Sequence, residues 1–97
     1  MQFIHAFIKS LNASNIDASM ILMKERFDEF VNYCEDSSVL MPERLTQANT
    51  MLNNLKTLRD DMISKFGSEI HEHIASLNYI SECIGTSSTL INIIQKG

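Results

Sequence analysis

The fold is decided by residues 42–84, PERLTQANTMLNNLKTLRDDMISKFGSEIHEHIASLNYISECI. Pro42 suits the first position of a helix, where its missing N–H removes no hydrogen bond. Gly67 can adopt the positive-φ conformation that closes a helix, and Ser68 can cap a following helix at once. Because so short a connection makes neighbouring helices antiparallel, the stretch predicts a helical hairpin that turns at Gly67.

Apolar residues recur at helical spacing on both sides of Gly67 and would give each helix one apolar face. The first set is Leu45, Ala48, Met51, Leu52, Leu55, Leu58, Met62, Ile63 and Phe66, and the second is Ile70, Ile74, Leu77, Ile80 and Ile84. A helix over residues 42–66 would be about 37 Å long at about 1.5 Å per residue. The hairpin is therefore expected to be the longest feature of the fold.

The clearest helical pattern precedes the hairpin, over residues 16–35. Its apolar positions alternate four and three residues apart, which is the spacing of a helix seam. These positions are Ile16, Met20, Met23, Phe27, Phe30 and Cys34. The opposite side is acidic and includes Glu25, Asp28 and Glu29. With Ser14 or Asn15 as its cap, this segment predicts a helix packed across the hairpin.

Both ends of the chain carry shorter apolar segments. Residues 2–11 place Phe3, Ile4, Phe7, Ile8 and Leu11 at helical spacing. After Gly85 the apolar residues keep the phase of the preceding helix, so the helix can run through the glycine. A separate helix capped within residues 86–89, or a β-branched strand over 91–94, is the alternative. Helix is the favoured interpretation.

These patterns predict an all-α fold: an antiparallel bundle of four or five helices, built on a long helical hairpin. The whole chain, residues 1–97, would be a single helical domain, because 97 residues bury one core but not two. One proline and three glycines leave little material for the turns that an all-β fold needs.

Composition narrows the partners and the compartment. The net charge is −4, and the eight Lys and Arg residues are scattered, which argues against nucleic-acid binding. No stretch approaches the roughly 20 apolar residues of a membrane span, and the N-terminus lacks the basic start of an export signal. Two cysteines fit a reducing compartment better than a disulfide framework. The expected location is the cytoplasm.

Residues 71–73, His-Glu-His, resemble a metal site, but helical geometry argues against it. Residues two apart on a helix point about 200° from each other, so His71 and His73 cannot hold one ion. Cys34 and Cys83 lie near predicted helix C-termini, the wrong end of the helix dipole for a reactive thiolate. No phosphate-binding glycine loop or nucleophile elbow is present. We therefore expect no metal, no cofactor and no enzymatic activity.

Two basic residues fall within the apolar arcs of the hairpin helices. Arg59 lies in the first arc and His73 in the second, at nearly the same level of an antiparallel hairpin. Either Arg59 emerges over its aliphatic stem and His73 is a neutral core residue, or a carboxylate reaches this polar layer. That carboxylate would come from Glu25, Asp28 or Glu29, or from a partner protein.

Some apolar residues lie off a predicted stripe, three form a triplet in the loop before Pro42, and the segment 90–94 is apolar nearly all round. A 97-residue monomer would have difficulty covering all of them. The candidate partner-binding residues are Ile21, Leu22, Val39, Leu40, Met41, Leu90, Ile93 and Ile94. They predict a non-enzymatic protein-binding module, such as a small chaperone, adaptor or regulatory subunit. Its partner would be another protein or a second copy in a homo-oligomer. The alternative is a phage- or bacteria-encoded inhibitor or immunity-type protein that blocks its target through the acidic helical face.

Overall fold

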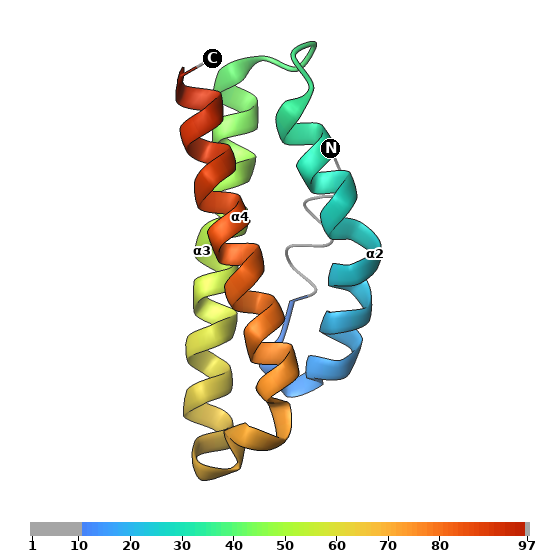
Figure 1. Ribbon diagram of the computed structural model, residues 1–97, viewed down its shortest axis with the longest axis vertical. Helices are drawn as coiled ribbons and strands as arrows, with labels where there is room; N and C mark the ends of the chain where they lie inside the picture. Colours follow the sequence, from blue (N-terminus) through green and yellow to red (C-terminus); the bar gives the residue numbers. More distant parts are fainter. Residues whose placement is uncertain (1–10, 97) are drawn as a thin grey trace.

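The computed structural model describes residues 11–96, in which all regular structure is helical and no strand occurs. The elements are η1 (Ala13–Asn15), α2 (Ile16–Glu35), α3 (Met41–Phe66), η2 (Gly67–His73) and α4 (Ile74–Lys96). Three α-helices of 20, 26 and 23 residues therefore make up most of residues 11–96 (Figure 1). The helix expected over residues 2–11 lies outside the described part of the chain, apart from Leu11.

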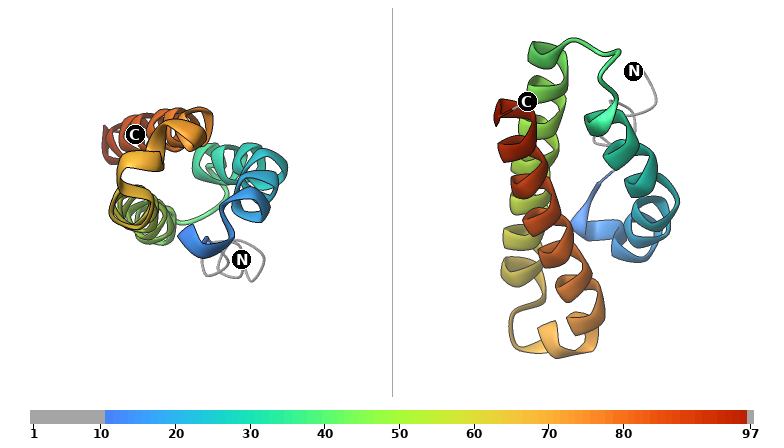
Figure 2. Two further views of the ribbon diagram at one scale, coloured as in Figure 1. Left: turned by 90° about the horizontal axis from the view of Figure 1, so that it is seen from below. Right: turned by 45° about the horizontal axis from the view of Figure 1, so that its top comes forward.

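The three α-helices run up, down and up, so that α3 is antiparallel to both α2 and α4 (Figure 1). Helices α3 and α4 lie side by side over their full length, as the hairpin predicts. Seen end-on, the helices stand at the corners of a triangle (Figure 2). The short η1 segment packs against α2 and α3. The described fold is thus a helical hairpin with a third helix laid along it.

The predicted boundaries of α2 and α3 are confirmed to within one residue. Helix α4 runs straight through Gly85 to Lys96, so its last part is neither a separate helix nor a strand. A glycine inside a helix costs about 1 kcal/mol, whereas burying one isoleucine stabilises by about 1.5–3 kcal/mol. Ile91 and Ile94 are both buried in α4, so continuation is favoured. Within residues 11–96 the fold therefore has three α-helices, and a bundle of four or five is not confirmed.

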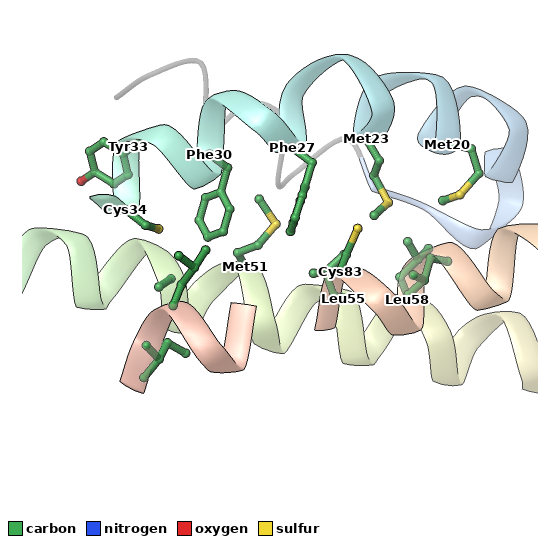
Figure 3. Close-up of a cluster of buried hydrophobic side chains, with 14 of the residues drawn as sticks. Met20, Met23, Phe27, Phe30, Tyr33, Cys34, Met51, Leu55, Leu58 and Cys83 are labelled. Carbon is green, nitrogen blue, oxygen red and sulfur yellow. The ribbon is translucent and has the colours of Figure 1, made fainter. Parts of the chain in front are cut away.

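The core lies between the three helices and is built from thioether, aromatic and branched side chains (Figure 3). Met23 and Phe30 of α2 are fully buried, as is Met51 of α3. The rings of Phe27 and Phe30 lie 5.6 Å apart at 41°, a tilted arrangement that suits aromatic pairs. Met51 extends toward these two rings, and sulfur–aromatic contacts of this kind are favourable.

The loop between α2 and α3 is held by two side chains. The Asp36 carboxylate accepts hydrogen bonds from the Ser38 N–H at 2.9 Å and the Ser38 hydroxyl at 2.6 Å. These bonds hold the pKa of Asp36 below its usual value. The Arg44 guanidinium donates to the carbonyls of Val39 at 3.0 Å and Cys34 at 3.1 Å. Arg44 therefore satisfies a carbonyl in the last turn of α2 that has no partner within the helix.

The predicted cap position of α2 is confirmed, but the side-chain capping bond is made three residues earlier. Asn15 occupies the N-cap position, but its side chain makes no capping bond. Asn12 caps η1 instead, because its Oδ1 accepts from the Ser14 N–H at 2.8 Å. The buried Ser19 hydroxyl then accepts from the Asn12 N–H at 3.0 Å and lies 3.1 Å from the Asn12 carbonyl, to which it donates. Asn12 thus fixes the chain at the start of α2.

The connection at the hairpin tip is longer than predicted. Gly67 has φ 52° and ψ −123°, and its N–H donates to the Ile63 carbonyl, which ends α3. The prediction that Ser68 caps the next helix at once is wrong, because the 3₁₀ helix η2 intervenes before Ile74. Phe66, at the end of α3, stacks on His73, at the end of η2, with ring centroids 4.0 Å apart. This stacking closes the tip.

Candidate functional site

The structure places the two residues of the predicted polar layer in different surroundings. Arg59 keeps 35% of its side chain exposed, and its Nε lies 3.4 Å from Oδ1 of Asp60. This carboxylate belongs to the next residue of α3 and not to α2. His73 stacks on Phe66 at an interplanar angle of 28°. Arg59 thus emerges to the surface over its aliphatic stem, as the first interpretation expects.

The two histidines of the His-Glu-His triplet also separate. The His71 ring is exposed, and its Nδ1 lies 3.1 Å from the Ser68 carbonyl oxygen. His73 is half-buried at the ring of Phe66. Across residues 11–96, no three His, Cys, Asp or Glu side chains lie close enough together to hold a metal ion.

Both cysteine thiols are buried and free. Burial raises the pKa of Cys34 to about 11, and the nearby Arg44 opposes this only in part. Burial likewise raises the pKa of Cys83 to about 11, although a hydrogen bond with Tyr79 acts in the opposite direction. At neutral pH both groups are therefore protonated thiols and poor nucleophiles.

The predicted acidic face of α2 is on the surface. Glu25, Asp28 and Glu29 are all exposed. Two cations are exposed among them, however, and Arg26 Nη1 lies 3.5 Å from Glu29 Oε1, one turn along the helix. Lys24 is the other cation. The face is thus acidic on balance and not uniformly so.

The eight candidate partner-binding residues divide by exposure. Leu40, Ile21, Ile93 and Met41 are exposed, with 74%, 60%, 55% and 43% of their surface accessible. Leu22 and Val39 are half-buried and pack against the core. Leu90 and Ile94 are buried, because the continuation of α4 through Gly85 turns both side chains inward. These last two are therefore not available to a partner.

Two exposed apolar residues were not among the candidates. Ile63 and Ile74 each expose 49% of their surface. Both lie at helical spacing with core residues, so the sequence pattern assigned them to the buried stripe. They lie at the edge of that stripe, and a three-helix arrangement leaves the edge uncovered.

The structure also has a groove between α2 and α4, which the sequence does not reveal. It consists of two clefts, of about 300 Å³ and about 700 Å³. The first is lined by Met20, Lys24, Ala75, Ser76, Asn78, Tyr79 and Glu82. The second is lined by Val31, Glu35, Glu82, Gly85, Thr86, Thr89, Leu90 and Ile93. Because Glu82 lines both clefts, they form one surface, which we call the α2–α4 groove.

The α4 side of the groove includes several small residues, among them Gly85 and Thr89. Nothing lies within 4 Å of the point where a Cβ would stand on Gly85, so the helix backbone is open to the groove there. The Thr89 hydroxyl donates to the Gly85 carbonyl at 3.1 Å, which satisfies both groups within the helix. An apolar occupant would therefore leave neither of these groups without a partner.

Tyr79 forms part of the wall of the first cleft. Burial, followed by the neighbouring Cys83, raises the pKa of its hydroxyl to about 12. Asp28 of α2 and Glu82 of α4 lie close enough to contribute to the same shift. Carboxylates from both helices thus lie near Tyr79, and with Glu35 and Glu82 against Lys24 the groove is acidic on balance.

The chain was compared with known protein families, with curated proteins and with solved structures, and none matches. In residues 11–96, no helix combines the length and the apolar character that crossing a membrane requires.

Proposed function

We propose that this chain is a non-enzymatic protein-binding module, such as a small chaperone, adaptor or regulatory subunit, that acts through helix–helix packing. The observation that carries the proposal is the set of large apolar side chains that the fold leaves on its surface. They are Ile21, Leu40, Met41, Ile63, Ile74 and Ile93. Exposed apolar side chains that gather into a patch are typical of protein interfaces.

The arrangement of these side chains supports helix packing as the mode of binding. All six lie on α-helices or directly before one, so a partner helix can reach them from outside. Leu40 and Met41 begin α3 at the end of the molecule where α4 terminates, and Ile93 lies in that last part of α4 (Figure 1). We place the protein in the cytoplasm, where its two free, buried thiols would stay reduced.

Affinity purification from the native cell tests the proposal when it uses two matched baits. The first bait carries Leu40→Gln and Ile93→Gln, which remove exposed apolar surface. The second carries Ser37→Gln and Asn92→Gln at neighbouring exposed positions. We expect mass spectrometry to find a partner that the wild type and the second bait retain and the first bait loses at least tenfold. Equal recovery on all three baits, together with a monomer by light scattering, contradicts the proposal.

A second candidate function is an inhibitor or immunity-type protein that blocks its target with the acidic face of α2. The exposure of Glu25, Asp28 and Glu29 on one helix supports it. Binding through that face should weaken steeply between about 50 and 500 mM salt, because the Debye length shortens from about 14 Å to about 4 Å. Binding through apolar surface should hardly respond. The salt dependence of the captured complex therefore separates the two functions.

A further inference from the structure

The α2–α4 groove has the properties of a binding site for another helix. Its walls are two helices that run in the same direction, and its lining combines apolar, small and charged residues. Ile93 is exposed on the α4 wall, and Val31 is half-buried on the α2 wall. A small residue lets an approaching backbone come close, and Gly85 provides this near the middle of α4.

The charges around the groove specify the kind of helix that fits. Two carboxylates line it, Glu35 on α2 and Glu82 on α4, and Asp28 of α2 lies near Tyr79. Lys24 is the cation among the lining residues. Cationic side chains on an occupant would therefore meet opposite charge on both walls, whereas an acidic helix would be repelled.

We propose that the α2–α4 groove is the docking site for a cationic amphipathic helix of another protein. This rests on the proposed protein-binding function and adds the location and chemistry of the partner. The apolar face of the helix packs on Val31 and Ile93, and its Lys or Arg residues reach Glu35 and Glu82. Because the Thr89 hydroxyl already donates a hydrogen bond to the Gly85 carbonyl, packing the apolar face there leaves neither group without a partner.

A second copy of this chain fits the groove less well. Its exposed α2 surface would bring Glu25, Asp28 and Glu29 to a groove that is already acidic on balance. The chain as a whole carries a net charge of −4, which opposes close association of two copies. The start of the described chain does not fill the groove either, because η1 packs against α2 and α3 and has no contact with α4.

The test uses a labelled synthetic peptide of about 18 residues, with leucines at helical spacing on one face and lysines elsewhere. Its control has glutamate in place of each lysine. Binding to the full chain is measured by fluorescence anisotropy. We expect the lysine peptide to bind at least tenfold more tightly than the glutamate peptide.

Gly85→Leu is the decisive variant, because a leucine there would fill the groove. The space above Gly85 is open and leucine favours a helix, so the variant should fold at least as stably as the wild type. We expect this variant to bind the lysine peptide at least tenfold more weakly than the wild type does. Ser81→Leu, at an exposed position of α4 that does not line the groove, is the matched control and should change binding less than twofold.

Charge reversal provides an independent test. Glu82→Lys, within the groove, should weaken binding of the lysine peptide at least fivefold. Asp61→Lys, at an exposed position of α3, should leave binding of this peptide unchanged. The two variants have the same net charge, so a difference between them locates the contact.

Four results would overturn the proposal. The first is equal binding of the lysine and glutamate peptides to the wild type, and the second is unchanged binding of the lysine peptide to Gly85→Leu. The third is a loss of stability in Gly85→Leu, and the fourth is a wild-type dimer that Gly85→Leu converts to a monomer. The third would mean that part of the same chain occupies the groove, and the fourth that a second copy does. Affinity purification from the native cell separates this failure from a failure of the proposed function. If the wild-type bait retains a partner that the Leu40→Gln with Ile93→Gln bait loses, only the groove assignment fails. If the wild-type bait retains no such partner, the proposed function fails as well.

Discussion

Helix α4 packs against two neighbours, and the two seams differ. Along α3 the seam is continuous from the tip at Gly67 to the end of α4, and fully buried residues of both helices, such as Leu55 and Ile80, contribute to it. Along α2 the inner side is equally well buried, but the outer side opens into the α2–α4 groove. The difference shows that α3 covers one side of α4 along its whole length, whereas α2 leaves part of the other side open.

The connections explain this contrast. A short connection keeps α3 and α4 antiparallel and adjacent from the tip upward. Helix α2 is joined to α3 and not to α4, so only side-chain packing brings it to α4. Its apolar residues fall within one stripe, and a single stripe cannot cover both flanks of the hairpin. The outer flank of the α2 seam is therefore the part of the fold where a partner can be added without breaking the core.

Removing the inner packing of α2 should have the largest effect. Phe30→Ala removes a fully buried ring that contacts the core between the helices. We expect the free energy of unfolding to fall by about 3–5 kcal/mol. Urea unfolding followed by circular dichroism measures it, with Asn32→Ala at an exposed position of α2 as the control, expected within about 0.5 kcal/mol. A loss below about 1 kcal/mol for Phe30→Ala would mean that α2 is not held by this face.

Alkaline pH should loosen the core by ionising Cys34 and Cys83. Both thiols have a pKa of about 11 when folded, against about 8.5 in an unfolded chain. Since the folded pKa is raised, stability is unaffected below about pH 8 and falls as pH rises from about 8.5 toward 11. The limit is about 3 kcal/mol per thiol.

Urea unfolding at pH 7, 9 and 10 measures this slope. The double variant Cys34→Ala with Cys83→Ala is the control, and its stability should depend less on pH. The single variants compare the two thiols. Cys83 has a hydrogen bond with Tyr79, which lines the groove, and Cys34 does not. An identical slope in the wild type and the double variant would rule out the thiols as its cause.

Replacing Gly67 or Gly85 with alanine should change stability in opposite directions. Gly67→Ala places a side chain at φ 52° and ψ −123°, where no neighbouring atom interferes but the backbone itself is strained. We expect a loss of about 1–3 kcal/mol. Gly85→Ala removes a glycine from a helix interior with open space above it, and should gain about 1 kcal/mol. Thermal unfolding of both variants measures the pair, and a loss for Gly85→Ala would show that the groove is not open.

Much of the architecture was predictable because it depends on local pattern. The spacing from Ile16 to Cys34 predicts α2, and Pro42 with Gly67 predicts the ends of α3. The continuation of α4 was left open, because the cost of Gly85 opposes the burial of Ile91 and Ile94 and only the folded structure shows how much is buried. The 3₁₀ segment η2 has no distinct pattern in the sequence.

The candidate site was predictable only in part. Ile21 lies off the stripe of its helix and is exposed, as are Leu40 and Met41 of the apolar triplet before Pro42 and Ile93 near the C-terminus. The α2–α4 groove was not predictable, because it depends on the angle and separation of two helices that are not consecutive. No periodicity within one segment reveals that Glu35 and Glu82 line the same cleft. In the sequence Gly85 is only a point that the helix can run through, whereas in the structure it is part of the groove surface.

The smallest effect is expected at the polar residue of the closed seam. Arg59→Met keeps the aliphatic stem and removes an exposed pair with Asp60, whose carboxylate lies 3.4 Å from Nε. Because surface pairs contribute about 0–1 kcal/mol, stability should change by less than about 0.5 kcal/mol. A double-mutant cycle with Asp60→Asn, measured by urea unfolding, should give a coupling energy equally small. A loss of about 3 kcal/mol or more would instead reveal a carboxylate buried with Arg59. The hairpin seam would then contain a charged layer, and the contrast between a closed apolar seam and an open acidic groove would no longer hold.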